Sequence, residues 1–246
     1  MFDLTGRTAL VTGAGQSVGA GIARCLAAQG AHVVVNDIVA GRAESVAQGI
    51  RTAGGSSSVS RFDVTDPESV ADGFAAAGAI DILVNNAGNA GAHTFAPKPF
   101  VEMEPDEYAR FLDVNLHGVL HCSRAALPGM YERGRGRIIT ISSGAGTTGN
   151  RMGISLYGAG KGGAIAFMRH LAMESAAMGV TANSLALGLM ANTAGGAHTE
   201  RLAKSIPVGR LGTPDDVGAA CVWLASDEAS WVTGKTITLD GGSITT

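Results

Sequence analysis

Residues 137–161, RIITISSGAGTTGNRMGISLYGAGK, contain an apolar strand, a glycine-rich loop and the start of a helix. Tyr157 and Lys161 are four residues apart, so they share one face of that helix, about one turn apart. An ammonium beside a phenol favours the phenolate, so we expect Lys161 to lower the pKa of Tyr157, which could then exchange protons near neutral pH. Ser142 and Ser143, at the end of the strand, could hydrogen-bond the reacting oxygen. The alternative is an ordinary half-exposed pair on a helix, and the rest of the chain must decide.

Short apolar runs alternate with helical patterns along the whole chain, which is typical of a parallel sheet covered by helices on both faces. Strands are predicted at residues 8–11, 32–35, 58–62, 80–84, 137–141, 180–185 and 236–239. Helices are predicted at residues 18–28, 43–53, 67–76, 105–127, 157–178 and 214–224. No interdomain linker or internal repeat interrupts this alternation. We therefore predict one α/β domain over residues 1–246, with a doubly wound parallel sheet of seven strands.

The composition restricts the class of protein. Of the 246 residues, 46% are hydrophobic and 16% charged, which provides a substantial core, and the net charge of −3 favours neither nucleic-acid nor membrane-surface binding. Cys25, Cys122 and Cys221 are far apart, so neither a disulfide framework nor a metal site is predicted. We see no signal peptide and no apolar run long enough to span a membrane, and we expect a cytoplasmic protein.

A glycine-rich segment, TGAGQSVGAG at residues 12–21, follows the first predicted strand and leads into a helix. Such a turn brings backbone amides and a helix N-terminus towards a pyrophosphate. The match to G-x-G-x-x-G is imperfect, because Val18 occupies the third glycine position and Gly19 follows it. A plain tight turn is the alternative, although the position between strand and helix favours a phosphate-binding turn.

Asp37 ends the second predicted strand, 24 residues after Gly13. An acidic residue near this distance can hydrogen-bond a ribose 2′-hydroxyl and repel a 2′-phosphate. Gln16, in the glycine-rich turn, provides no positive charge for that phosphate. The sequence therefore favours NAD over NADP, with a structural turn residue as the alternative role for Asp37.

Polar residues also follow the third and fourth predicted strands, at Asp63 and in the segment NNAG at residues 85–88. Ligands of open parallel sheets bind at the carboxyl ends of the strands, so these residues should line one edge. Asn115 lies inside the long predicted helix, where asparagine is a poor helix former. It is either exposed to solvent or a buried polar group that bonds backbone and a water.

His117 and His121 are four residues apart on the same predicted helix, a spacing that can bind zinc. No third ligand is evident, so we predict no metal and favour a packing or subunit-contact role. Arg133, Arg135 and Arg137 are expected to form a solvated turn before the fifth strand.

Taken together, these motifs closely resemble those of the short-chain dehydrogenase/reductase family over essentially the whole chain. The family's T-G-x-x-x-G-x-G turn is matched by Thr12, Gly13 and Gly19, with Ser17 in place of the middle glycine. Its N-N-A-G segment is matched at residues 85–88. Its catalytic tetrad is matched by Asn115, Ser143, Tyr157 and Lys161, its N-x-x-x-P-G segment by Asn183 and Gly188, and its D-G-G segment by Asp240, Gly241 and Gly242.

The resemblance implies a Rossmann fold and reversible hydride transfer between NAD and a secondary alcohol or ketone. It implies that Tyr157 is the acid/base, that Lys161 tunes Tyr157 and holds the nicotinamide ribose, that Ser143 polarises the substrate oxygen, and that Asn115 supports a water-linked proton relay. The residues implied to bind the cofactor are Gly13, Gln16, Ser17, Val18, Gly19, Asp37, Ile38, Asp63, Val64, Asn86, Ala87, Gly88, Val114, Tyr157, Lys161, Gly188 and Met190. A homotetramer or homodimer is also implied.

The sequence departs from the family pattern at Ser17, at Gly160 where a serine is usual, and at Leu187 where a proline is usual. Ser143 is one residue further from Tyr157 than expected, so Ser142 remains an alternative for the substrate-facing serine. Residues 190–207 are expected to form a mobile substrate lid, with apolar walls from Met152, Leu189, Met190 and residues 90–100. Alternative functions are an NADPH-dependent 3-oxoacyl-(acyl-carrier-protein) reductase and a non-catalytic nucleotide-binding protein.

Overall fold

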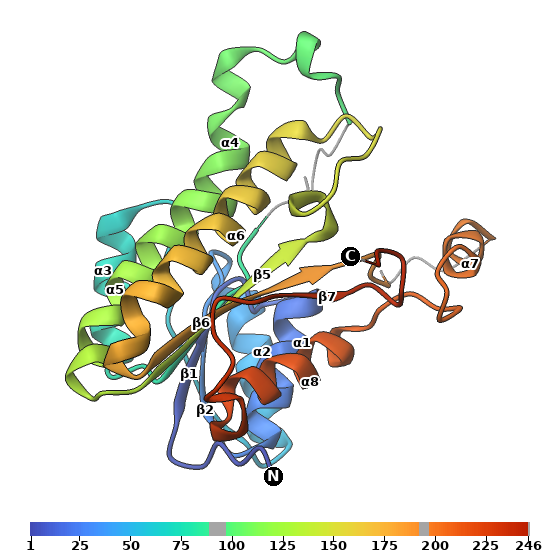
Figure 1. Cartoon of the computed structure of the whole chain (residues 1–246). Coiled ribbons are helices and arrows are strands. Elements are labelled where there is room, and N and C mark those ends of the chain that lie inside the picture. Colours follow the sequence, from blue (N-terminus) through green and yellow to red (C-terminus); the bar gives the residue numbers. More distant parts are fainter. Residues whose placement is uncertain (89–96, 192–196, 246) are drawn as a thin grey trace.

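Seven strands form one parallel sheet in a computed structural model that describes residues 1–88, 97–191 and 197–245 (Figure 1). The strands are β1 (Thr8–Val11), β2 (His32–Val35), β3 (Ser56–Val59), β4 (Ile82–Asn85), β5 (Gly136–Ser143), β6 (Val180–Leu187) and β7 (Thr236–Leu239). Their order in the sheet is β3-β2-β1-β4-β5-β6-β7, and every neighbouring pair is parallel. The chain therefore reverses direction across the sheet between β1 and β4, where ligands bind in folds of this kind. The predicted doubly wound α/β fold is confirmed.

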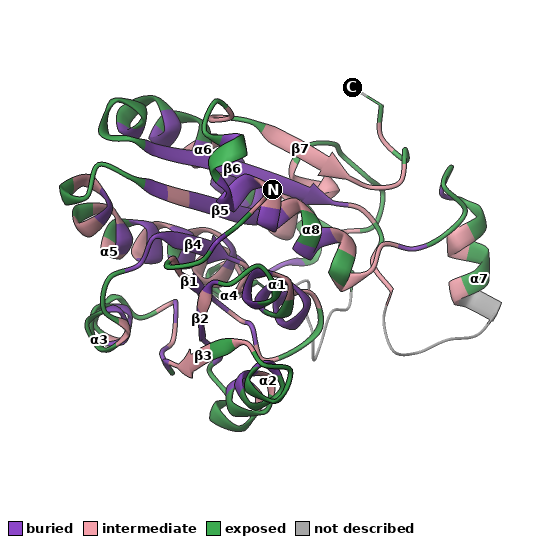
Figure 2. Ribbon diagram, turned by 90° about the horizontal axis from the view of Figure 1, so that it is seen from below, coloured by how far each residue is buried: buried purple, intermediate pink, exposed green. Residues whose placement is uncertain are grey.

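Helices cover both faces of the sheet, because alternate residues of the central strands point to opposite faces and both sets are apolar. One core packs α1 (Ser17–Ala28), α2 (Ala40–Thr52) and α8 (Pro214–Ala225) against the sheet. The other core packs α3 (Pro67–Ala77), α5 (Gly118–Glu132) and α6 (Ser155–Ser175) against the opposite face. Figure 2 shows the central strands as buried between these two layers, whereas β7 at the edge is only half buried.

The helix predicted at residues 105–127 is interrupted. It consists of a 3₁₀ turn (Pro105–Glu107), α4 (Ala109–Leu112), a π-helical turn (Asp113–His117) and α5. The side-chain amide of Asn115 donates to the Phe111 carbonyl oxygen at 2.9 Å, so the side chain takes a carbonyl that the backbone would otherwise use. Single π turns of this type are frequent at functional sites.

Four predicted strands have wrong bounds. β4 lies at Ile82–Asn85 instead of residues 80–84, and β5 extends over Gly136–Ser143 instead of residues 137–141. The other two differ for a physical reason. The third strand lies at Ser56–Val59 instead of residues 58–62, because Ser56 and Ser58 pair with the two ring nitrogens of His32 on β2. The sixth strand continues to Leu187 instead of ending at residue 185. A leucine at this position, unlike the family's usual proline, can continue the ladder.

The segment predicted as a lid contains a helix, α7 (Ala197–Lys204), which stands away from the sheet in Figure 1. Its sequence, AHTERLAK, contains several good helix formers, which the loop prediction underweighted. Most of the predicted wall at residues 90–100 lies outside the described residues, as do residues 192–196 of the lid.

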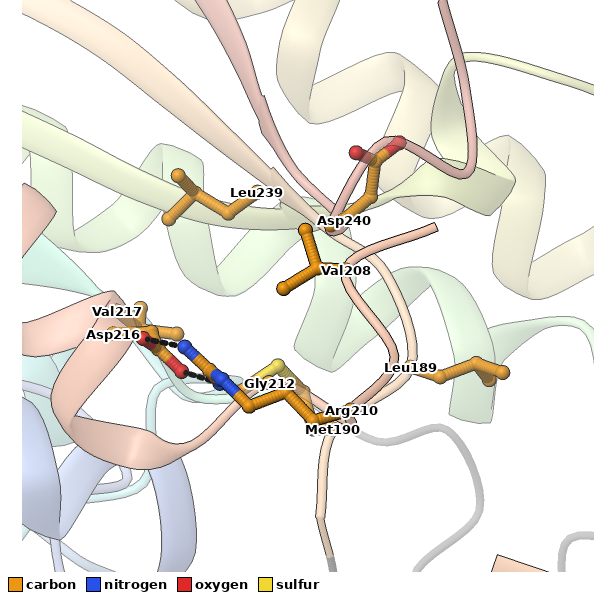
Figure 3. Close-up of a pocket in the computed structure, with 10 residues that line it drawn as sticks. Leu189, Met190, Val208, Arg210, Gly212, Asp216, Val217, Leu239 and Asp240 are labelled. Carbon is orange, nitrogen blue, oxygen red and sulfur yellow. Dashed lines mark hydrogen bonds and ion pairs between the residues drawn. The ribbon is translucent and has the colours of Figure 1, made fainter. Parts of the chain in front are cut away.

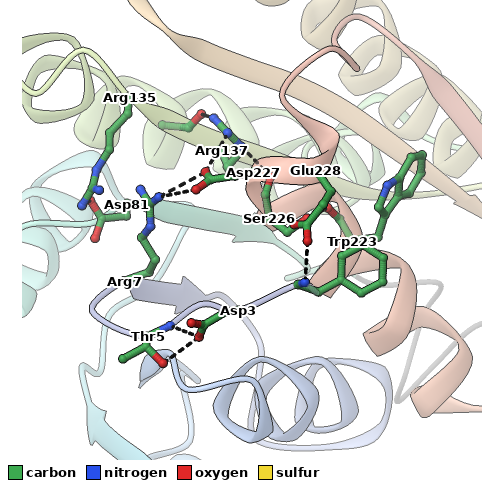
Figure 4. Close-up of polar contacts among 12 residues, drawn as sticks. Asp3, Thr5, Arg7, Asp81, Arg135, Arg137, Trp223, Ser226, Asp227 and Glu228 are labelled. Carbon is green, nitrogen blue, oxygen red and sulfur yellow. Dashed lines mark hydrogen bonds and ion pairs between the residues drawn. The ribbon is translucent and has the colours of Figure 1, made fainter.

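The amino-terminal edge of the sheet is held by charged pairs (Figure 4). Arg7 and Arg137 both pair with Asp227, at 3.0 and 3.5 Å. Asp81 accepts hydrogen bonds from the Thr8 backbone amide at 3.0 Å and from Arg135 at 3.1 Å. The prediction of a solvated arginine turn is wrong for Arg137, whose side chain is only 11% exposed because it packs under the residues that follow α8, whereas Arg133 and Arg135 are exposed. In the described residues, no helix is long and apolar enough to cross a membrane.

Candidate active site

Two adjoining pockets lie along the carboxyl edge of the sheet. The first has a volume of about 220 Å³ and is lined by Gly13, Gln16, Asn36, Asp37, Ile38, Arg42, Phe62, Asp63, Val64, Asn86, Ala87, Gly88 and Val114. The second, of about 190 Å³, is lined by Val18, Asn86, Gly88, Ile141, Ser142, Ser143, Tyr157, Lys161, Leu187, Gly188 and Met190. Asn86 and Gly88 belong to both pockets, so the two are continuous. Of the residues predicted to form the site, all line one of these pockets except Ser17, Gly19 and Asn115.

The glycine-rich turn is locked to the segment that follows β4. The Thr12 hydroxyl accepts hydrogen bonds from the backbone amides of Asn86 and Ala87, both at 3.0 Å. The Asn86 side chain donates to the Thr12 and Gly13 carbonyl oxygens at 2.9 and 3.0 Å. A Cβ at Gly13 would lie 2.9 Å from the Ala87 Cα, so the two loops touch through backbone. Only a glycine allows this approach.

The N-terminus of α1 opens towards the first pocket. Its N-cap residue, Gln16, makes no side-chain capping hydrogen bond, and the first turn contains no acidic residue. The first backbone amides of the helix are therefore available to an anion. Ser17 has a φ of 49°, in the left-handed region that favours glycine, which explains why a glycine is usual at this position of the family turn.

Asp37 is 6% exposed, and its carboxylate organises the turn. It accepts hydrogen bonds from the backbone amides of Gly15 at 3.1 Å and Val39 at 2.9 Å. Arg42, which the sequence analysis did not single out, lines the same pocket, and its Cβ and the Asp37 carboxylate flank Gly15. Arg42 therefore brings a basic residue to the lining of this pocket, where Gln16 alone had indicated no positive charge. No motif marks Arg42, because it enters through the packing of α2.

Asn36 was also missed. Its side-chain oxygen accepts from the Gly13 backbone amide at 3.2 Å, and its amide donates to the Ser60 and Phe62 carbonyl oxygens at 3.1 and 3.0 Å. Asn36 thus ties the ends of β1 and β2 to the segment after β3. Asn36 directly precedes Asp37 at the end of a strand, and this position could have indicated that it belongs to the site.

Tyr157 and Lys161 lie in the first two turns of α6, beside the end of β5. A hydrogen bond from the Ser143 hydroxyl reaches the Tyr157 phenol. The neighbouring Ser142 is buried and donates to the Lys161 backbone carbonyl oxygen at 3.1 Å. The two serines point in different directions because successive side chains of a strand alternate. Ser143 is therefore the serine that faces the phenol.

Burial raises the pKa of Tyr157, and the Ser143 hydrogen bond lowers it by less. The expectation that Lys161 lowers this pKa is therefore wrong for the chain in this structure. Burial also lowers the pKa of Lys161 to about 8, and the ammonium donates to the Ile141 carbonyl oxygen at 2.8 Å. Desolvation dominates both groups, since neither is compensated by a buried charge of the opposite sign in the described residues.

Asn115 is fully buried and lies next to Lys161, which excludes the solvent-exposed alternative. A Cβ at Gly88 would lie 2.8 Å from the Lys161 ammonium nitrogen and 2.9 Å from the Asn115 side-chain oxygen. These three residues therefore converge below the second pocket. Gly160 also faces Asn115: a Cβ there would approach the Asn115 Cβ to 3.0 Å, so the departure to glycine relieves crowding.

The two histidines bind separate partners. His117 contacts Asp113 at 2.9 Å, and His121 contacts the Val64 carbonyl oxygen at 3.0 Å. No cluster of potential metal ligands occurs among the residues that the structure describes.

A third cavity of about 190 Å³ lies beside Met190, between β7 and the segment that follows α7 (Figure 3). On one side, Arg210 forms a two-pronged pair with Asp216 at 2.7 and 2.8 Å. On the other side lie Leu239 and Asp240. Of the predicted substrate walls, Leu189 is 46% exposed beside this cavity and Met152 is 54% exposed.

Comparisons with known proteins agree with this geometry. A family model described as enoyl-(acyl carrier protein) reductase matches residues 13–243. The 3-oxoacyl-[acyl-carrier-protein] reductase FabG of Escherichia coli K12 is 36% identical over 249 residues, 98% of each chain. A gluconate 5-dehydrogenase from Burkholderia cenocepacia J2315, solved with NADP and tartrate, is 36% identical with a TM-score of 0.88 over 98% of this chain and 96% of that one. A 7α-hydroxysteroid dehydrogenase, solved with NADH and 7-oxo glycochenodeoxycholic acid, is 32% identical with a TM-score of 0.90 over 99% and 96%.

Proposed function

The chain belongs to the short-chain dehydrogenase/reductase family of oxidoreductases, and we propose that it transfers a hydride reversibly between NAD and a secondary alcohol or ketone. The observation that carries this proposal is the Ser143–Tyr157 hydrogen bond beside the buried Lys161, at the end of a continuous pocket that starts at an uncapped helix. A protein that only bound nucleotides would not need this buried acid/base group.

The residues of the two pockets fit a dinucleotide. Asp37 and Ile38 would hold the adenosine ribose, Asp63 and Val64 the adenine, and the turn from Gly13 to Gly19 with the α1 N-terminus the pyrophosphate. Asn86, Ala87, Gly88 and Val114 would line the middle, and Lys161, Gly188 and Met190 the nicotinamide riboside. The fit rests on the uncapped α1 amides and on glycines whose bare backbone lines the pocket. The cofactor supplies the hydride chemistry, while the chain binds and orients.

The side chains of the second pocket would then transfer the proton of the substrate hydroxyl. Ser143 donates to the substrate oxygen and holds it beside the Tyr157 phenol. Tyr157 accepts the alcohol proton during oxidation and returns it during reduction. Lys161 favours the phenolate by charge once the pocket is occupied, and Asn115, adjacent to its ammonium, supports a relay of protons through water.

Asp37 is the reason for proposing NAD. Its buried carboxylate would accept a hydrogen bond from a ribose 2′-hydroxyl and repel a 2′-phosphate. A second candidate is an NADPH-dependent reductase of 3-oxoacyl groups. The position of Arg42 beside Asp37 favours it, since a guanidinium could bind the 2′-phosphate, and the similarity to FabG supports it.

The test is a ketone and alcohol screen at 340 nm, with ethyl acetoacetate, cyclohexanone and their alcohols, using NAD(H) and NADP(H) in parallel. We expect turnover with NADH to exceed turnover with NADPH. Tyr157→Phe should lower kcat by about 10²–10⁴-fold, because the acid/base group is lost, while NADH binding measured by fluorescence is retained.

The matched control is Tyr131→Phe, since the Tyr131 hydroxyl bonds Ser175 away from the pockets. This variant should lose about 1 kcal/mol of stability and keep its turnover. Undiminished turnover of Tyr157→Phe contradicts the proposed role of Tyr157, and faster turnover with NADPH favours the second candidate.

A further inference from the structure

Residues 240–244 form a hydrogen-bonded turn after β7. Gly241 and Gly242 have φ values of 64° and 89°, so the backbone reverses in a conformation that other residues rarely adopt. The Asp240 carboxylate accepts hydrogen bonds from the Gly242 backbone amide at 3.0 Å and from the Ile244 backbone amide at 2.8 Å. The Ser243 hydroxyl donates to the Asp240 carbonyl oxygen at 2.8 Å. Ile244 is thus held in place by the turn itself.

The turn crosses the carboxyl end of β6 to reach β5. The Gly188 backbone amide donates to the Leu239 carbonyl oxygen at 2.9 Å, and a Cβ at Gly188 would lie 2.7 Å from the Asp240 Cβ. Beyond this crossing, a Cβ at Gly144 would lie 3.1 Å from the Ile244 Cδ1. Ile244 therefore contacts the residue that directly follows Ser143.

The same turn is attached to the segment that follows α7. The Val208 backbone amide donates to the Gly241 carbonyl oxygen at 3.1 Å, and a Cβ at Gly241 would lie 2.6 Å from the Ile206 Cγ2. Val208 and Asp240 lie close together on one side of the cavity in Figure 3. The turn thus connects the base of the predicted lid with the strand that carries Ser143.

We propose that residues 240–244 form a wall of the substrate site and that Ile244 is a specificity-determining residue, which limits the bulk of an apolar group on the ketone. The inference rests on the proposed function. The Ile244 side chain packs against Gly144, directly after Ser143, and the end of β6 at the apolar Leu187 lies on the same side of Gly144. A polar group on this side of a substrate would lose its hydrogen bonds to water without replacement, so the wall selects alicyclic or branched hydrocarbon groups.

The experiment compares cyclohexanone with 4-tert-butylcyclohexanone as substrates of Ile244→Ala, Ile244→Val and Ile244→Phe, with the preferred cofactor. We expect Ile244→Ala to raise the ratio of kcat/KM for the bulky ketone over the small one by about 10-fold or more, mainly through KM, since one to a few methylene groups change discrimination by this amount. Ile244→Val should give a smaller rise, and Ile244→Phe should lower the ratio. The NADH dissociation constant should not change.

Thr245→Ala is the matched control, because Thr245 is the exposed neighbour of Ile244. A graded shift across the three Ile244 variants that is absent from Thr245→Ala supports the proposal. Turnover that changes equally for both ketones, or not at all, overturns it and leaves the proposed function standing. If the wild-type chain reduces no ketone with either cofactor, both proposals are overturned.

Discussion

The two edges of the same parallel sheet differ in whether their buried or half-buried charged side chains have partners of opposite charge. At the amino-terminal edge, charged groups meet: Asp227 pairs with Arg7 and Arg137, and Asp81 pairs with Arg135 (Figure 4). At the carboxyl edge, Lys161 is buried, and in the described part of the chain no carboxylate pairs with it. Burial lowers the pKa of Lys161 to about 8, because removal from water disfavours its charged form.

This difference in pairing indicates different roles for the two edges: the paired charges contribute to stability, and the unpaired charge contributes to function. Charges that neutralise one another hold the strands in register and need nothing from solvent or ligand. A charge that the fold buries without an opposite partner destabilises the chain, and such groups concentrate where a ligand provides the missing interaction. A substitution that removes charge should therefore have opposite consequences at the two edges.

Lys161→Met should give the largest effect. Loss of the ammonium should lower turnover by about 10²-fold or more, because under the proposed function Lys161 favours the Tyr157 phenolate in the occupied pocket and holds the nicotinamide ribose. The same change should stabilise the chain at pH 7 by up to about 3 kcal/mol, from the fall of the lysine pKa from 10.5 to about 8. Steady-state kinetics and urea unfolding measure the two effects. A variant that is both inactive and less stable contradicts the comparison.

The stability effect of Lys161 should also depend on pH. Below pH 8 both folded and unfolded chains carry the proton, so the full cost of burial is present. Between about pH 8 and 10.5 the folded chain has lost the proton that the unfolded chain keeps, so wild-type stability rises with pH relative to Lys161→Met. The stability advantage of the variant should shrink across this window in unfolding experiments, and a constant difference from pH 7 to 10 contradicts the assignment.

Asp81→Asn tests the opposite edge. The Asp81 side chain is 10% exposed and accepts from Thr8 and Arg135, so its neutral analogue should lose about 2 kcal/mol of unfolding free energy. Turnover per folded molecule should not change, because Asp81 lies at the amino-terminal edge of the sheet and the pockets lie at the carboxyl edge. Asp72→Asn, at an exposed position of α3, is the control and should stay within about 0.5 kcal/mol of the wild type. Reduced kcat in Asp81→Asn at a temperature where it is folded contradicts this separation.

The sequence was sufficient for most of the fold because the decisive signals are local. The bounds of β1, β2 and β7 follow from short apolar runs between turn residues, and α8 begins at Pro214, as predicted. The errors arise where distant residues decide. The serines of β3 become strand residues through His32, which lies on another strand.

The site was predictable for the same reason: its residues lie at strand ends that carry recognisable motifs. Arg42 was not, because it lies in the first turn of α2, just before the helix predicted at residues 43–53, and no motif marks it. The directions of the Tyr157 and Lys161 pKa shifts could not be predicted from the sequence. A spacing of four residues in a helix indicates that the two side chains are close, but it does not indicate how deeply they are buried. Burial is a property of the whole fold, and here it outweighs the attraction between neighbours.

Asp37→Asn extends the comparison to the cofactor pocket and should have a smaller effect. The amide keeps the shape of the carboxylate and one of its hydrogen bonds to the turn, but it removes the charge that would repel a 2′-phosphate. We expect the ratio of kcat/KM with NADPH over that with NADH to rise by about 10-fold. Arg42→Ala is the matched variant and should lower the same ratio. An unchanged ratio in Asp37→Asn assigns Asp37 to the turn alone.

Ser17→Gly should give the smallest effect of these variants, a change in unfolding free energy. It tests whether the backbone at the carboxyl edge is strained in the turn that would bind the pyrophosphate. Ser17 holds a φ of 49°, which costs a side-chain-bearing residue about 1–2 kcal/mol, whereas a glycine adopts it freely but loses more backbone entropy on folding. The two contributions oppose each other, so the variant should gain about 0.5 kcal/mol. Ser45→Gly is the control, because Ser45 is exposed inside α2, where glycine should cost about 0.5–1 kcal/mol. The unfolding free energies of both variants are measured in parallel urea titrations. A gain for Ser17→Gly with a loss for Ser45→Gly shows that Ser17 is strained in the glycine-rich turn. A loss of unfolding free energy in both variants shows that the Ser17 side chain stabilises the turn instead.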